Sequence, residues 1–308
     1  MKNLRPIDGI FIFGISYLLS VLATAGISRF LSARTVTLIS IVILAGVAFF
    51  LLKMAVGQPL RYVGVRRAGP RLILYTILAS LSIIVPVMSL EAVTLFRFKI
   101  PQEIIDALNE IIKARTVPEL LYVLLIVAVG AAVSEEFVFR GILQRSLASR
   151  FGAWAAILIT SLVFALLHTI WRLPPALILG VFLGVLYWRT QSLVLPMISH
   201  FTINSAAVIA LFVAEKRGEA SMPLWIREEK PAPIWMTVVS LALFFVFLRA
   251  IWRQGAPTVA QTEPSAGVLA VAQEEPSRAA PAITQEEPSA EALDPPASDA
   301  RPKDGETP

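Results

Sequence analysis

Eight apolar segments constrain this chain more than any other feature of its sequence. A helix needs roughly 20 apolar residues to cross the hydrocarbon core of a bilayer. The chain approaches that length in eight places with few charges, which predicts an all-α, polytopic bundle of about eight transmembrane helices. The spans are expected at about Gly9–Ser28, Thr35–Leu52, Leu72–Leu90, Pro118–Phe139, Phe151–Ile170, Pro174–Trp188, Leu193–Ala214 and Ile234–Leu248.

Composition divides the chain into two parts. Residues 1–254 are the predicted membrane domain, whereas residues 255–308 turn to Pro, Ala, Glu and Ser without apolar periodicity, which predicts a disordered acidic tail. Between the third and fourth spans, apolar residues recur at helical spacing after Pro101, which predicts an interfacial helix. Cysteine is absent, so disulfides, thiolate metal ligands and a cysteine nucleophile are excluded.

Charge is distributed unevenly between these parts. The tail carries ten acidic and three basic residues, net −7, so the membrane domain must be +12 for the total to be +5. The basic excess therefore belongs to the membrane domain and does not indicate a nucleic-acid partner. Between the second and third spans lies a basic cluster that predicts a cytoplasmic loop: Lys53, Arg61, Arg66, Arg67 and Arg71. With eight spans, both termini are then expected in the cytoplasm.

Two adjacent carboxylates, Glu135 and Glu136, lie at the end of the fourth span. Ionisable groups at membrane depth are costly and commonly functional. Residues four apart share a helix face, so Arg140 is expected to pair with Glu136. Glu135 points about 100° away from that face and is left without a counter-charge. This predicts an orienting Glu136 and a working base at Glu135.

The only two histidines also lie in apolar spans. Glu135 precedes Phe151 by 16 residues and His168 follows it by 17, so a turn near Phe151 would bring both to the same level, about 24 Å from the turn. This requires both segments to be continuous helices. Phe164 shares the face of His168 and would wall an intramembrane active-site cavity.

The seventh span contributes a second polar face. His200 and Asn204 are four residues apart and therefore lie on one side of a helix. Pro196, four residues before His200, is expected to loosen the backbone ladder there. Each motif alone is also consistent with a structural role, as an interhelical hydrogen bond or a buried ion pair. Their concentration in one part of the chain favours function.

Three motifs in this order resemble the CPBP family of intramembrane proteases, which includes CAAX endopeptidases and bacterial Abi proteins. They are Glu-Glu-x-x-x-Arg at Glu135–Arg140, Phe-x-x-x-His at Phe164–His168 and His-x-x-x-Asn at His200–Asn204. The resemblance covers about residues 118–210. It implies an intramembrane endopeptidase in which Glu135 and His168 activate a water.

The resemblance further implies roles for the remaining motif residues. Glu136 and Arg140 would hold their helix, and His200 with Asn204 would bind a metal or stabilise the oxyanion. The expected metal is zinc, with Glu135, His168, His200 and Asn204 as its ligands. Asparagine is not among the usual zinc ligands and no His-Glu-x-x-His is present, so a metal-free mechanism stays open.

Other function classes remain as alternatives. A Ser/His protease is disfavoured because no Gly-x-Ser-x-Gly is present. Glu, His and Arg in spans also build proton-coupled transporters, although no duplicated halves are visible. A non-catalytic membrane adaptor is the third alternative. The expected partners are membrane lipid and a peptide or protein substrate, with no nucleic acid, and the expected location is a bacterial plasma membrane.

Overall fold

The computed structural model describes residues 4–98, 102–218 and 230–254. Within these ranges it contains helices and connecting segments and no strand, which confirms the all-α prediction. The predicted tail at 255–308 lies outside the described residues. The helices before the site are α1 (Pro6–Ile27), α2 (Ala33–Val56), α3 (Pro59–Tyr62), α4 (Pro70–Arg97) and α5 (Gln102–Ile112).

The fourth predicted span is one helical rod with five consecutive parts. They are α6 (Val117–Val123), the π-helix η1 (Leu124–Gly130), α7 (Ala131–Glu136), the π-helix η2 (Phe137–Gln144) and α8 (Arg145–Phe151). A π-helix is rare, and π segments inside helices occur frequently at functional sites. Both carboxylates lie in the short α-helical part between the two π segments. The uniform α-helix assumed from the sequence is therefore wrong for this span.

The remaining helices follow a reversal at Gly152, whose φ of 79° is readily adopted only by glycine. They are α9 (Ala153–Leu166), the 3-10 helix η3 (Ile170–Arg172), α10 (Leu173–Thr190), α11 (Val194–Arg217) and α13 (Ile234–Gln254). The predicted reversal near Phe151 is confirmed. In α11, Pro196 lies in the first helical turn, where its missing N–H breaks no internal bond, so the loosened ladder expected there is wrong.

Seven of the described helical elements are long and apolar enough to cross a membrane, and α9 is not one of them. Its 14 residues span only about 21 Å, against a hydrocarbon core of roughly 30 Å. The helix stops early because the chain must turn before Pro174 and Pro175, which fit only the first turn of the next helix. The count of eight full spans is thus corrected to seven plus one short helix. The location of both termini in the cytoplasm stays a prediction.

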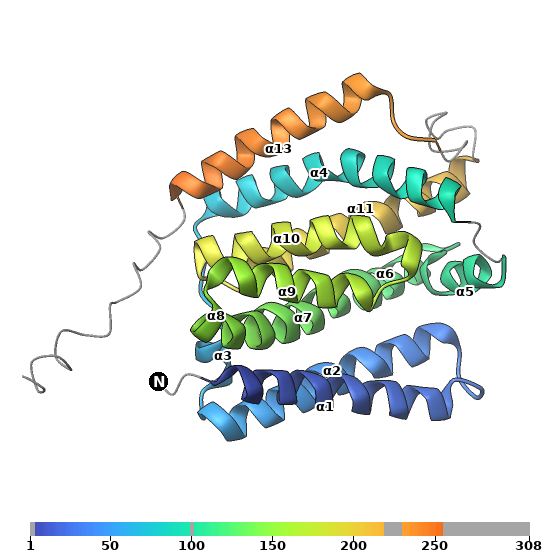
Figure 1. Ribbon diagram of the computed structural model, residues 1–308. Coiled ribbons are helices and arrows are strands. Elements are labelled where there is room, and N and C mark those ends of the chain that lie inside the picture. The colour runs from blue at the N-terminus through green and yellow to red at the C-terminus, as the bar shows by residue number, and fades with distance from the viewer. Residues whose placement is uncertain (1–3, 99–101, 219–229, 255–308) are drawn as a thin grey trace, which may run out of the picture. The chain divides into compact units, whose positions relative to one another are not determined.

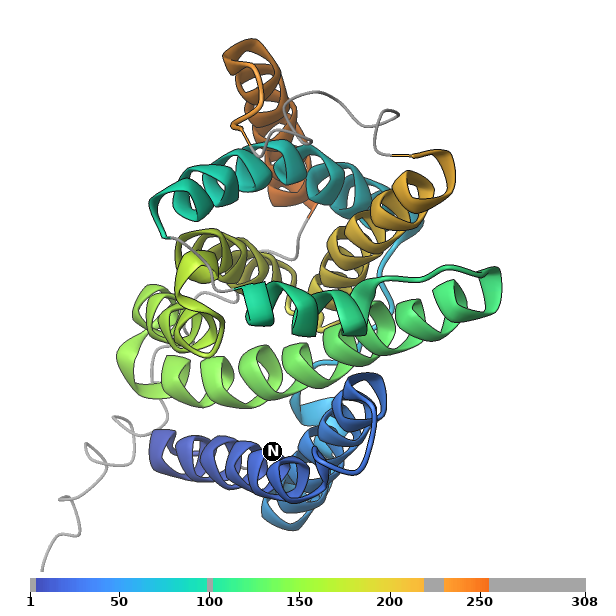
Figure 2. The same cartoon turned by 90° about the vertical axis from the view of Figure 1, so that its right-hand side faces the viewer.

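The rod of α6 to α8 lies between two groups of helices (Figures 1 and 2). The antiparallel pair α1 and α2 packs on one side of it, and α9, α10 and α11 pack on the other. Helix α4 contacts α10 and α11 and is covered by α13. The polar motifs on the rod therefore face other helices on both sides, which is how charged groups inside a membrane protein are kept away from lipid.

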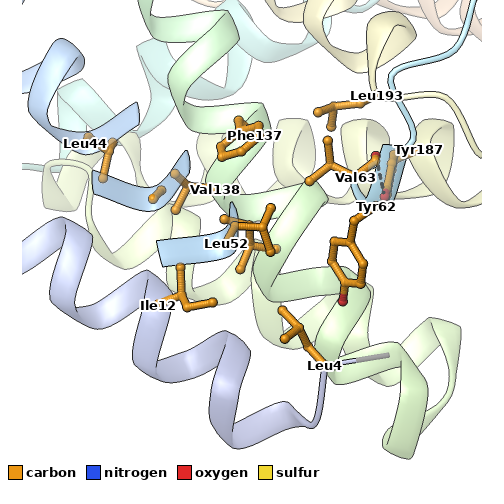
Figure 3. Packing of buried hydrophobic residues seen from close by; sticks show 12 residues of the cluster. Leu4, Ile12, Leu44, Leu52, Tyr62, Val63, Phe137, Val138, Tyr187 and Leu193 are labelled. Carbon is orange, nitrogen blue, oxygen red and sulfur yellow. Dashed lines mark hydrogen bonds between the residues drawn. The ribbon is translucent and has the colours of Figure 1, made fainter. Parts of the chain in front are cut away.

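A buried cluster joins the first helices to the rod (Figure 3). Ile12 of α1 and Leu52 of α2 pack there with Val138 of η2. A β-carbon on Gly141 would come within 2.8 Å of the Val63 side chain, so this approach requires glycine. The packing fixes η2 against α3, and hence fixes the segment that begins directly after Glu136.

The amphipathic segment after Pro101 forms α5, as predicted, whereas its position at a membrane interface stays a prediction. Its last carbonyls accept hydrogen bonds from Arg34 of α2, namely those of Glu110, at 3.0 Å, and Ile111, at 3.2 Å. Arginine there satisfies carbonyls that have no partner within the helix. A recess of about 520 Å³ lies beside these residues and is lined by charges of both signs, among them Asp106 and Glu119.

Candidate active site

A fully buried ion pair forms the centre of the polar cluster. Arg140 Nη1 donates to Glu136 Oε1 at 2.9 Å, and neither side chain is exposed to solvent. The pairing predicted from the four-residue spacing is confirmed. The guanidinium also lies 4.9 Å from the centre of the Phe164 ring, a cation–π contact that is stronger away from water. Phe164 therefore forms an apolar wall, as the sequence predicted.

Arg140 is held from the other side by the backbone of α10, a contact that the sequence reasoning missed. Its Nη2 donates to the Gly180 carbonyl at 3.1 Å, and Gln144 Nε2 donates to the Gly184 carbonyl at 3.0 Å. The two donors are four residues apart, and so are the two acceptors. Successive turns of η2 therefore bond to successive turns of α10. The available signal was Gly180-x-x-x-Gly184, a spacing of small residues that lets membrane helices approach closely.

Replacing Gly180 with alanine tests this close approach. The new β-carbon would meet the Ser161 β-carbon at 3.0 Å and its α-carbon at 3.1 Å, so α9 and α10 must separate. We expect a loss of about 1–3 kcal/mol of stability, measured as a lower unfolding midpoint in detergent. Gly46→Ala is the matched control, because nothing lies within 4 Å of that position in α2. Equal midpoints for the two variants would contradict the tight α9–α10 contact.

His200 joins the ion pair through the same carboxylate oxygen. Its Nδ1 lies 2.8 Å from Glu136 Oε1, and the residue is buried. When the ring is neutral and Nδ1 carries the proton, Nδ1–H donates to the carboxylate and Nε2 presents a lone pair. Nε2 can donate a hydrogen bond in this arrangement only when the ring is an imidazolium. The hydrogen bond to Glu136 thus fixes the tautomer of the neutral His200 ring and makes Nε2 an acceptor.

His168 lies two residues beyond the end of α9, in the turn before η3. The continuous helix through His168 expected from the sequence is therefore wrong. Its Nδ1 is 2.7 Å from the Phe164 carbonyl, and its ring centre is 4.5 Å from that of Phe164. With Nδ1–H donating to this carbonyl, Nε2 is the acceptor. The Phe164 ring also contacts His200, at 6.3 Å between centres, so one aromatic ring joins both histidines.

Glu135 differs from its neighbour in the way the sequence predicts. It is half-buried, and no ion pair or hydrogen bond holds it within the described part of the chain; its Oε2 is enclosed without a partner, as is Oε2 of Glu136. Among the described residues Glu135 and His168 share no hydrogen bond, so their expected joint action stays a prediction. An enclosed acceptor next to a paired carboxylate is available to bind a proton.

Asn204 lies one turn after His200 and also faces the rod, which confirms that both share a side of α11. One N–H of its amide donates to the Val127 carbonyl of η1 at 2.9 Å. The amide has a second N–H and a carbonyl oxygen that this bond does not use. The π segment η1 therefore supplies a carbonyl acceptor for one N–H of Asn204. The second N–H of the Asn204 amide can still donate to a bound molecule.

The donor set fits a metal only in part. Both histidines have Nδ1 engaged and Nε2 available, the arrangement usual for metal-ligating histidines with an outer partner. No group of three or more His, Asp or Glu side chains in the described ranges is placed to hold a metal ion, however. The predicted zinc ligands Glu135, His168, His200 and Asn204 therefore do not form a metal cage here.

Comparison with known proteins points to the same segment. Residues 117–206 match the model of the type II CAAX prenyl endopeptidase Rce1-like family. The uncharacterized protein YpbD of Bacillus subtilis (strain 168) is 32% identical over 102 residues, which are 32% of this chain and 48% of that protein. The chain thus matches about half the length of this curated relative. No solved structure matches the chain. Residues 117–206 carry all six motif residues, so this similarity falls on the segment that resembles the CPBP family, and the resemblance is confirmed.

Proposed function

We propose that this chain is an intramembrane endopeptidase that hydrolyses a peptide bond of a substrate reaching it from the membrane. The observation that carries the proposal is the contrast between the two adjacent carboxylates. Glu136 binds Arg140 and His200 through one oxygen, whereas Glu135 has no hydrogen bond or ion pair to any described residue; the second oxygen of each carboxylate is enclosed without a partner. A general base must be free to accept a proton, and Glu135 meets that requirement.

In the proposed reaction, a water attacks the scissile carbonyl carbon and gives a proton to the Glu135 carboxylate. The carbonyl becomes a tetrahedral oxyanion. The C–N bond then breaks, and the proton passes from Glu135 to the leaving amine nitrogen. His168 Nε2 would accept a hydrogen bond from the attacking water and orient it, because Nδ1 is fixed to the Phe164 carbonyl.

The oxyanion would be stabilised from α11. Asn204 has one N–H that is not used by Val127, and fixed donors of this kind stabilise charge that develops in the transition state. His200 can add a second donor through Nε2 when it is an imidazolium, a form in which Nδ1–H still donates to Glu136 Oε1.

The test of this function is the cleavage of membrane-associated peptides. Full-length protein reconstituted in vesicles is compared with Glu135→Ala at equal abundance, and products are identified by mass spectrometry. New peptide ends that appear only with the intact chain would support the proposal. Normal abundance without any difference in products would favour the transporter or adaptor alternatives.

Dependence on metal is a separate prediction. Since the described residues do not gather three metal-ligating side chains, we expect purified protein to contain zinc far below one equivalent and to keep its activity in chelator. Elemental analysis and activity before and after chelation measure this. A loss of activity that zinc restores would instead show that the enzyme requires zinc and would overturn this prediction.

A further inference from the structure

Seven exposed basic side chains gather at one end of the helices, here called the basic end. They come from α2, α3, the segment before α4, the first turn of α4, α8 and α13: Lys53, Arg61, Arg66, Arg67, Arg71, Arg150 and Arg253. Within the described ranges, no carboxylate forms an ion pair with any of them. This end therefore presents a positive charge that the described chain does not neutralise.

Contacts between these elements hold them together at the basic end. Tyr187 Oη, near the end of α10, donates to the Val63 carbonyl at 2.9 Å, and the Arg145 guanidinium of α8 lies 4.9 Å from the centre of the Tyr62 ring. Ser192 Oγ donates to the Arg66 carbonyl at 2.9 Å. Figure 1 shows α3, α8 and the last turn of α13 on this side. The basic side chains are thus presented on a fixed scaffold.

Three tryptophans from different helices contact one another near the basic end. The ring centres of Trp154 and Trp188 are 5.5 Å apart, and those of Trp188 and Trp252 are 5.7 Å apart, which links α9, α10 and α13. Trp154 is 55% exposed and Trp252 is 41% exposed, so these rings are available to lipid. Arg189 donates to the Trp252 carbonyl and lies 5.1 Å from its ring centre. Tryptophans beside arginines are typical of the membrane–water interface.

Helix α13 gives the distance between the two interfaces. Trp235 lies at its start and Trp252 near its end, 17 residues later, which corresponds to about 26 Å of helix. On α10, Gly180 precedes Trp188 by eight residues, or about 12 Å. The Arg140 guanidinium, which is bonded to the Gly180 carbonyl, therefore lies near the middle of the membrane if Trp188 marks the interface.

The opposite end differs in charge. Lys113 pairs with Glu215 at 3.0 Å, and Arg172 pairs with Glu91 at 2.9 Å. The recess beside α5 also combines both signs of charge. Because acidic residues accompany the basic ones there and pair with Lys113 and Arg172, the positive charge is partly offset, and a negatively charged surface has less to attract it at that end.

We propose that the basic end binds the headgroups of anionic phospholipids, with Trp154, Trp188 and Trp252 at the level where headgroups meet acyl chains. Charge complementarity identifies the ligand, because unpaired arginines beside exposed tryptophan rings match a phosphate above an apolar chain. Each basic residue near an anionic membrane surface contributes about fivefold to binding. The basic end thereby anchors one leaflet and sets the depth of the candidate active site.

The experiment compares two matched pairs of charges in the full chain. Arg66→Gln/Arg67→Gln removes two adjacent cations from the basic end, and Lys216→Gln/Arg217→Gln removes two adjacent cations from the opposite end. Binding of phosphatidylglycerol and phosphatidylcholine to detergent-solubilised protein is measured by native mass spectrometry, with inorganic phosphate as competitor. All four side chains are exposed, so both variants should keep the parent unfolding midpoint.

We expect intact protein to prefer phosphatidylglycerol, Arg66→Gln/Arg67→Gln to bind it roughly 25-fold more weakly, and the control pair to bind as the parent does. Equal weakening in both variants would overturn the proposal, because the attraction would then be a property of total charge. No preference for phosphatidylglycerol over phosphatidylcholine would overturn it too. Displacement by inorganic phosphate at the same concentration as the lipid would show a free-phosphate site and overturn the lipid assignment.

Discussion

Glu135→Gln is expected to reduce peptide hydrolysis by at least about 10²–10⁴-fold while the protein stays folded and inserted. The amide has nearly the size of the carboxylate but cannot accept the proton of the attacking water. Because Glu135 forms no ion pair with any described residue, the substitution should lower the stability of the fold only slightly. Initial rates on a membrane-associated peptide, normalised to folded protein, measure the effect. Glu103→Gln, the same change at an exposed position of α5, is the matched control and should keep full activity.

His168→Ala is expected to cause a loss of the same order, and the double variant should be little worse than either single variant. Residues that act on one water as a unit give strongly non-additive losses. Substantial turnover in Glu135→Gln, with abundance verified, would remove Glu135 from the role of base. Losses that multiply in the double variant would mean that Glu135 and His168 act in separate steps.

Arg140→Ala is expected to cause the largest loss of stability, on the order of 3–5 kcal/mol. The change removes hydrogen bonds to Glu136 and to the Gly180 carbonyl, and leaves a fully buried carboxylate with His200 as its partner. The unfolding midpoint in lipid-free detergent measures the effect. Arg150→Ala, at an exposed position of the same rod, is the control and should change stability by less than about 0.5 kcal/mol.

The comparison with Glu135→Gln separates chemistry from structure at these adjacent carboxylates. Arg140→Ala should melt well below Glu135→Gln, because only Arg140 neutralises a buried charge. If the two variants melted at the same temperature, Glu136 and Arg140 would not be the pair that holds the helix. The division of roles between the neighbouring glutamates would then have to be abandoned.

Local spacing in the sequence was enough to predict several features of the structure. The apolar segments predicted helices, and the four-residue spacings predicted that Arg140 pairs with Glu136 and that His200 and Asn204 share a side of α11. These predictions succeeded because they depend on helix geometry within one segment. The reversal near Phe151 was equally local, since Gly152 adopts a φ of 79° there.

Local spacing in the sequence did not predict the contacts between separate segments. Nothing within the rod indicates that Glu136 also binds His200, 64 residues later, or that Arg140 bonds to the Gly180 carbonyl. Both contacts depend on how α10 and α11 pack against the rod. The early end of α9 was missed for a similar reason, because an apolar run continues past Leu166 while the backbone must turn before Pro174.

The sequence by itself determined which residues bear charge inside the membrane and which of them share a helix face, because helix periodicity fixes both. The same periodicity predicted that Glu135 is the carboxylate without a counter-charge, and only the tertiary structure decided that His200 joins Arg140 on Glu136. Glu136 is neutralised by one partner on its own helix and a second on α11, whereas Glu135 faces no counter-charge at hydrogen-bonding distance in the described chain. The contact with His200 arises from the packing of separate helices, which brings distant residues together through the burial of whole helix faces rather than through any spacing along the chain.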